Sequence, residues 1–260
     1  MKVSETFEYR TSFFLKLFLA SGINFLIRYL LWKEIFTYSG VTEINGYSFN
    51  EMVLYYIFST FIYLIVDSNR VGIEIGKGIR LGELSKFLVY PITFFEYNFF
   101  TFFGKKIIQA STSLLALAAV FFAFPQLGEQ FTITISTILM LCVLVVLGIA
   151  LNFLIDLFLS NFAFWIDEIW TVIVIKMFIT QLLSGMILPL DFFPKYAVEI
   201  FRFLPFQYIL YFPVKVWLGQ VPFAEIMFGI QVCVVWVFAL MLMHFLFWRK
   251  GLRLYSGIGM

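Results

Sequence analysis

Six long apolar stretches most constrain what this chain can fold into. A helix needs about 20 apolar residues to cross the hydrocarbon core of a bilayer. Stretches near that length occupy residues 12–32, 50–67, 107–124, 131–155, 169–188 and 223–247. Hydrophobic residues make up 62% of the chain and charged residues 13%, against about 45–50% and about 25% in soluble domains. We therefore expect an all-α, polytopic membrane protein: six transmembrane helices in a single domain that covers residues 1–260.

The distribution of lysine and arginine predicts the orientation, because these residues favour short cytoplasmic loops. With the N-terminus inside, twelve of them fall on the cytoplasmic side and four outside. Both termini are then cytoplasmic. The connection 68–90 lies in the cytoplasm and the connection 189–221 lies outside.

The stretch GIEIGKG at 72–78 has some features of a phosphate-binding loop. That motif reads G-x-x-x-x-G-K-[ST], but only three residues separate Gly72 from Gly76, and Gly78 follows Lys77 where a hydroxyl should be. The chain therefore carries no nucleotide-binding motif, and we expect no enzymatic activity and no bound cofactor. With His244 as its one histidine and no Cys/His cluster, it also offers no metal site.

The segment 68–90 combines apolar residues at mainly helical spacing with charges of both signs. Such a face can lie in a groove on a partner protein. Its four glycines are expected to break the helix into short pieces, since each costs about 1 kcal/mol relative to alanine. The alternative is an interfacial loop that rests on lipid headgroups.

Three stretches resemble a known family: GELSKFLVYP at 82–91, GMILPLDFFP at 185–194 and LPFQYILYFP at 204–213. In their order along nearly the whole chain they are similar to the type-2 ABC exporter permeases, in particular the six-span bacterial permease subunits of roughly 260 residues. In that family the cytoplasmic segment between spans two and three docks on a separate ATPase as a coupling helix. The external segment between spans five and six forms re-entrant helices.

The resemblance implies a permease subunit of an ATP-driven exporter in the bacterial inner membrane. ATP and magnesium would be bound by two copies of a partner ATPase, and a second permease subunit, identical or paralogous, would complete the pathway across the lipid bilayer. No nucleic-acid partner is expected. The resemblance places the ATPase-docking contacts at Glu74, Lys77, Arg80, Gly82, Glu83 and Leu84.

Prolines punctuate the external segment and divide it into pieces too short to cross a bilayer, since proline inside a helix costs about 3 kcal/mol. A re-entrant hairpin fits this pattern, and a surface-lying amphipathic loop fits nearly as well. The candidate residues of this segment are Pro189, Asp191, Pro194, Pro205 and Pro213.

Two charged residues inside the spans are candidates for the translocation pathway, because intramembrane charges are costly and often functional. Arg28 lies about one turn from Trp32 and could instead snorkel outward. Lys176 could snorkel or form an ion pair with one of three acidic residues: Asp156, Asp167 or Glu168.

Other functions fit the sequence less well than an exporter. An ion-coupled secondary transporter often shows inverted repeats, and no internal repeat is visible. An intramembrane enzyme needs clustered catalytic groups that face a cavity, and the sequence shows none. A non-transporting membrane scaffold remains an alternative.

Overall fold

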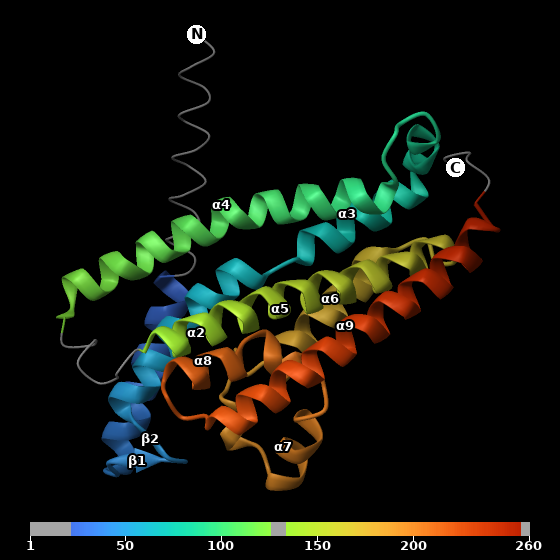
Figure 1. Ribbon diagram of the computed structural model, residues 1–260. Coiled ribbons are helices and arrows are strands. Elements are labelled where there is room, and N and C mark those ends of the chain that lie inside the picture. Colours follow the sequence, from blue (N-terminus) through green and yellow to red (C-terminus); the bar gives the residue numbers. More distant parts are fainter. Residues whose placement is uncertain (1–21, 126–133, 256–260) are drawn as a thin grey trace. The chain divides into compact units, whose positions relative to one another are not determined.

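The computed structural model describes residues 22–125 and 134–255 (Figure 1). The chain divides into two compact units, Met1–Thr60 and Phe61–Met260. The fold is helical, as expected, and four of the described helices are long and apolar enough to cross a membrane: Phe49–Arg80, Phe94–Ala123, Ile135–Phe164 and Phe223–Leu252.

The first unit contains a helix over residues 22–39, followed by a short hairpin. Residues 12–21 of the expected first span lie outside the described residues. Strand β1 (Glu43–Ile44) pairs antiparallel with β2 (Tyr47–Ser48). The turn between them is Asn45-Gly46, and both residues have positive φ, 49° and 79°. This is the backbone of the turns that Asn-Gly favours in tight hairpins. Helix α2 (Phe49–Val66) follows the hairpin directly.

The second unit is built on long helices joined by short ones. The bounds are α3 (Asn69–Arg80), η1 (Glu83–Leu88), α4 (Phe94–Ala123), α5 (Ile135–Ser160), η3 (Asn161–Phe164), α6 (Ile169–Leu183), η4 (Leu190–Phe192), α7 (Lys195–Phe201), η5 (Phe206–Ile209), α8 (Tyr211–Trp217) and α9 (Phe223–Leu252). Helices α5 and α9 pack side by side (Figure 1), and α5, which also contacts α3, α6 and α8, lies at the centre of this unit. Tyr208 of η5 lies against Gly148 of α5 and Gly229 of α9, while Phe158 and Phe247 meet nearer their C-terminal ends at 5.1 Å. The two helices therefore run in the same direction.

Helix α6 is shorter than the apolar stretch at 169–188 from which we expected a fifth span. It ends at Leu183 because Gly185 adopts a left-handed φ of 78° and Pro189 follows. A helix of 15 residues is about 22 Å long, and the hydrocarbon core is about 30 Å thick. Helix α6 alone is therefore too short to cross it.

The glycines of 68–90 do not act as expected. Helix α3 runs unbroken through Gly72, Gly76 and Gly78, and the first two lie where other helices come very close. A Cβ at Gly72 would lie 2.8 Å from Ile173, and one at Gly76 would lie 2.8 Å from Ile169. The expected break was wrong at these three glycines, because tight packing of α3 against α6 offsets the low helix propensity of glycine. Of the four glycines, Gly82 alone separates two helical pieces, α3 and η1. The helix ends where Gly82 takes a φ of 76°.

Helix α4 begins at Phe94, well before the apolar core expected at 107–124, because a capping box fixes its start. The Thr93 hydroxyl accepts from the Glu96 backbone N–H, and the Glu96 carboxylate accepts from the Thr93 backbone N–H at 2.8 Å. Each side chain satisfies one N–H that the first turn leaves without a partner.

Replacing Thr93 with alanine is expected to destabilise the protein by about 1 kcal/mol, since the cap loses its hydroxyl. In detergent-solubilised protein the midpoint of thermal unfolding should fall by about 2–4 °C. Thr93→Ser keeps the hydroxyl and serves as the control. If alanine and serine gave equal midpoints, the cap would contribute nothing to stability.

Candidate functional site

The α2–α3 connection is a break in one long helical run, at Asp67 and Ser68. The backbone carbonyls next to the break are held by side chains from other helices. Asn152 of α5 donates its amide N–H to the Val66 carbonyl at 2.9 Å, and the Lys106 ammonium of α4 donates to the Asp67 carbonyl. Buried carbonyls need such partners, so the break is fixed in place by α4 and α5.

A buried ion pair lies beside the break. The Lys176 ammonium of α6 is 3.0 Å from the Asp156 carboxylate of α5 and donates to the Asn152 side-chain oxygen at 2.6 Å. Ser68, at the start of α3, donates its hydroxyl to the same carboxylate. The side chain of Asp156 is 0% exposed and that of Lys176 is 4% exposed. We call Ser68, Lys106, Asn152, Asp156 and Lys176 the buried polar cluster.

This cluster joins four helices through charged groups removed from solvent. Taking each ion out of water costs several kcal/mol, and a buried pair offsets that cost only when its remaining hydrogen-bonding capacity is also satisfied. Asn152 binds both the ion pair and the α2–α3 break, because it accepts from Lys176 and donates to the Val66 carbonyl. The cluster therefore fixes the positions of α3, α4, α5 and α6 at one level of the bundle.

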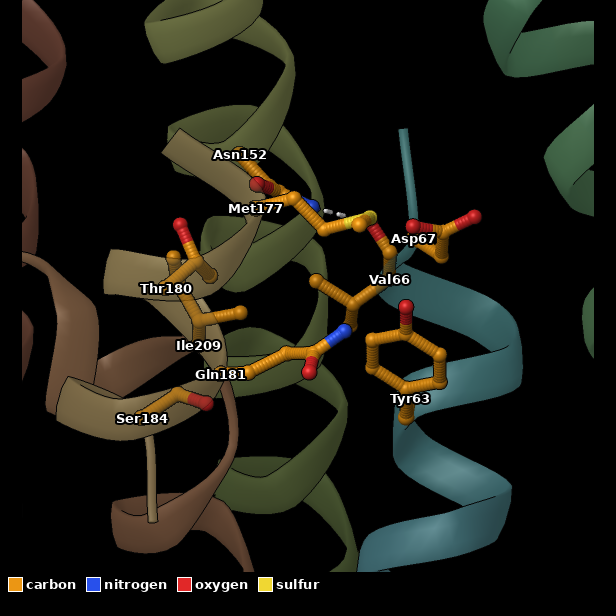
Figure 2. Close-up of a pocket in the computed structure, with 9 residues that line it drawn as sticks. All are labelled: Tyr63, Val66, Asp67, Asn152, Met177, Thr180, Gln181, Ser184 and Ile209. Atoms are coloured by element: carbon orange, nitrogen blue, oxygen red, sulfur yellow. Dashed lines mark hydrogen bonds between the residues drawn. The ribbon is translucent and has the colours of Figure 1, made fainter. Parts of the chain in front are cut away.

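A small cavity lies against the cluster (Figure 2). Its volume is about 10 Å³, which leaves room for roughly one water molecule. Among its lining side chains, the Thr180 hydroxyl is buried and has no hydrogen-bond partner within the described residues. The cavity suits a water that bridges polar groups and is too small for a transported molecule. Its lining residues are Tyr63, Val66, Asp67, Asn152, Met177, Thr180, Gln181, Ser184 and Ile209.

The residues expected to contact an ATPase divide into exposed and buried ones. Glu74, Lys77 and Arg80 lie on the exposed side of α3. Arg80 pairs with Asp167 at 3.4 Å and Glu74 with Lys105 at 4.0 Å.

In η1, the Glu83 carboxylate pairs with Lys86 at 3.2 Å, and both side chains are partly or largely exposed. Gly82 supplies the left-handed turn before them. Leu84, in contrast, is buried, so its side chain packs inside the protein and is not available on the surface. The docking role of all these residues stays a prediction.

The two pathway candidates lie in different units. In the first unit, the Arg28 guanidinium sits 5.2 Å from the centre of the Tyr56 ring, in a cation–π arrangement. In the second unit, Lys176 takes Asp156 as its partner out of the three acidic residues considered. Asp167 pairs with Arg80 instead, and Glu168 caps the first turn of α6.

The prolines of 189–221 stand at the starts of short helices. Pro189, Pro194 and Pro205 precede η4, α7 and η5, and Pro213 lies in the first turn of α8. These positions need no backbone N–H. Asp191 of η4 accepts from the Tyr211 hydroxyl at 2.7 Å and pairs with Lys215. The segment is therefore folded back on itself.

Sequence reasoning missed Ser68, Lys106 and Asn152 as members of a site. Lys106 stands next to Lys105 just before the apolar stretch 107–124, a place typical of exposed basic residues, yet its side chain is buried. Asn152 offered one signal, because it is an amide in the middle of an otherwise apolar stretch, and buried amides need partners. Nothing in the sequence indicates that its partners are the Val66 carbonyl and the Lys176 ammonium.

The fold and the buried polar cluster define a helical membrane protein whose spanning helices are joined by internal polar contacts. The family described as ABC-2 family transporter protein matches residues 23–259. The chain belongs to this family, which makes it a membrane component of an ABC transporter. No curated protein and no solved structure matches it.

Proposed function

We propose that this chain is the permease subunit of an ATP-driven exporter and that it docks a separate ATPase through the segment α3–η1. Two permease subunits would enclose the pathway and two ATPase chains would supply the energy. Both termini would lie in the cytoplasm, in keeping with the twelve-to-four bias of lysine and arginine.

One observation supports this proposal most: the segment α3–η1 is exposed on one side and tightly packed against other helices on the opposite side. Helix α3 is packed through Gly72 and Gly76 against α6, so it cannot move without displacing that helix. A docking element must be rigid in this way if binding of a partner is to displace the transmembrane helices. A loop that rests loosely on headgroups would not transmit motion.

The short helix η1 is also held in place, by an aromatic cluster. We define this cluster as Phe87, Phe94, Phe164, Trp248 and Tyr255. Phe87 packs on Phe94 with ring centres 5.3 Å apart, and Phe94 stacks on Trp248 of α9 at 5.9 Å. Trp248 in turn meets Phe164 of η3 at 5.4 Å. The cluster therefore connects η1 to the end of α9 and to the turn between α5 and α6.

Apolar side chains next to η1 remain uncovered. Leu81 is 68% exposed and Val89 is 85% exposed, and Tyr90 lies beside them, also exposed. The preceding helix α3 adds exposed charges of both signs: Glu74, Lys77 and Arg80. Exposed apolar side chains accompanied by charged ones on one segment are typical of a protein–protein interface. Leu81 and Val89 therefore extend the docking surface, and the buried Leu84 supports it from within.

Replacing Leu81 with aspartate is expected to lower the amount of ATPase recovered with the chain by about tenfold. A carboxylate placed in an apolar contact must lose its hydration, and 1.4 kcal/mol of lost binding is a factor of ten. The tagged chain is solubilised from native membranes in mild detergent, and the copurifying proteins are identified and quantified by mass spectrometry. Leu84→Asp is unsuitable here because it would disturb internal packing.

The matched control is Tyr196→Asp on α7, which places the same charge at another exposed position and should leave recovery unchanged. If unaltered protein brings no ATPase with it, the exporter proposal fails and an ion-coupled transporter becomes the better candidate. If Leu81→Asp retains the ATPase in full, docking lies elsewhere on the chain.

A further inference from the structure

A second, larger cavity lies at the opposite end of the second unit from η1. Its volume is about 290 Å³, and its walls come from η4, α7, η5, α8 and the first turns of α9. Helix α9 has 30 residues and is about 45 Å long. Its first turns line this cavity, while Trp248 near its other end belongs to the aromatic cluster. The cavity is therefore remote from the proposed docking surface.

Two cations and two anions line this cavity. Lys215 and Asp191 are 3.4 Å apart, and Arg202 and Glu225 are 3.8 Å apart. Charge-assisted hydrogen bonds in proteins are typically about 2.7–2.9 Å long. Both ion pairs are longer than that, while Asp191 also accepts from the Tyr211 hydroxyl at 2.7 Å. The lining is neutral as a whole, so a ligand with a single charge would leave one charge unmatched.

Uncharged polar groups add directional contacts. The Gln220 side-chain oxygen is buried and, within the described residues, has no hydrogen-bond partner. Burial, together with the neighbouring Asp191 carboxylate, raises the pKa of Tyr211 far above its ordinary value. Burial likewise raises the pKa of Tyr208 to about 12. Both phenols thus stay protonated near neutral pH. Tyr211 donates its O–H to Asp191 and Tyr208 donates its O–H to the Arg202 carbonyl, so each phenol oxygen can accept a hydrogen bond from a ligand.

The surroundings of the cavity are apolar and uncovered. Tyr196, Ile200 and Phe203, on and just after α7, are exposed, and so is Phe223 at the start of α9. Helix α7 has no buried residue at all. Exposed aromatic side chains beside polar groups are typical of the boundary between lipid and water. A ligand with an acyl part could rest on these side chains while its polar part occupies the cavity.

We propose that this cavity binds a zwitterionic group of the size of phosphoethanolamine, with its anion held by Arg202 and Lys215 and its cation by Asp191 and Glu225. The cavity volume of about 290 Å³ lies just below the range for ligand pockets, about 300–1,000 Å³, which suits a headgroup. The same chemistry is available from a phospholipid or from a free zwitterion. This inference does not depend on ATPase docking.

The test measures binding of two lipids that differ in one charge. Full-length protein in detergent is titrated with phosphatidylethanolamine and, separately, with phosphatidylglycerol, which carries the anion without the ammonium. Native mass spectrometry gives the bound fraction. We expect phosphatidylethanolamine to bind about tenfold more tightly, and Arg202→Glu to remove about tenfold of that affinity, since a hydrogen bond to a charged group is worth at least this factor.

The matched control is Lys195→Glu, which makes the same change of charge on α7 at an exposed residue that does not line the cavity. It should bind as the unaltered protein does. Equal affinity for the two lipids, or an Arg202→Glu variant that binds as the unaltered protein does, would overturn the proposal.

Calorimetry with soluble glycerophosphoethanolamine, whose phosphodiester and ammonium carry one charge each, distinguishes the two sources. Binding of the soluble compound with the same sensitivity to Arg202→Glu assigns the site to a free zwitterion, and binding of the lipid alone assigns it to a headgroup. Should Arg202→Glu fail to fold, the double variant Arg202→Glu/Glu225→Arg restores both charges to the cavity. Retained preference for phosphatidylethanolamine in the folded double variant supports the proposal, and a lost preference refutes it.

Discussion

Replacing Lys176 with methionine is expected to destabilise the protein by about 3–5 kcal/mol. The change removes the ammonium and leaves the fully buried Asp156 carboxylate without its ion-pair partner, and an uncompensated buried charge costs this much. The midpoint of thermal unfolding should fall by about 10 °C in detergent-solubilised protein, as 1 kcal/mol corresponds to about 2–4 °C for chains of this size.

Two further variants test the cause of this loss. Lys105→Met breaks the exposed pair with Glu74 and should change stability by less than about 1 kcal/mol. Adding Asp156→Asn to Lys176→Met removes the charge but keeps an oxygen that can accept from Ser68, and it should recover a large part of the loss. If Lys176→Met alone were as stable as the unaltered protein, the pair would contribute nothing to stability.

Replacing Gly251 with alanine is expected to cost about 3 kcal/mol, at the upper end of the range for overpacking. A Cβ there would lie 2.1 Å from a ring carbon of Phe164. That ring is itself held by Trp248 and Tyr255, so it has little freedom to move aside. The new methyl group must push the end of α9 away from η3.

Two measurements check this prediction. The midpoint of thermal unfolding should fall by about 6–12 °C, and recovery of the ATPase should fall with it, since the displaced aromatic cluster also holds η1. The control is Gly104→Ala in α4, where nothing lies within 4 Å. There the same substitution should leave stability unchanged or raise it by up to about 1 kcal/mol, as alanine is the better helix former. Equal effects at the two positions would contradict the packing argument.

The membrane-spanning elements could be predicted from the sequence because apolar length is a local property of the chain. Helices α5 and α9 occupy nearly the expected stretches. The start of α4 differed because a cap between Thr93 and Glu96 decided it. The end of α6 differed because Gly185 turns the chain inside an apolar stretch. In both places a local feature of the backbone, a helix cap in one and a glycine turn in the other, decided the helix boundary against the apolar composition.

The buried polar cluster could be predicted only in part. From the sequence, Lys176 could either snorkel or pair with one of three acidic residues, and Asp156 was one of the three. The choice among them depends on which residues of α5 face α6, and neighbouring helices decide that. The glycines of α3 were misread for a related reason. A propensity describes an isolated helix, whereas Gly72 and Gly76 serve contacts with residues about 90 to 100 positions later in the chain.

The break at Asp67 and Ser68 has a mechanical consequence. Its carbonyls are bound by Lys106 and Asn152, and Asn152 also binds Lys176. No single one of these bonds can be released without leaving another buried group unsatisfied, and each such group costs about 1–3 kcal/mol. The break between α2 and α3 therefore does not bend gradually under force. A small force leaves its geometry unchanged, and a force large enough to change it must break the whole set of hydrogen bonds in one step.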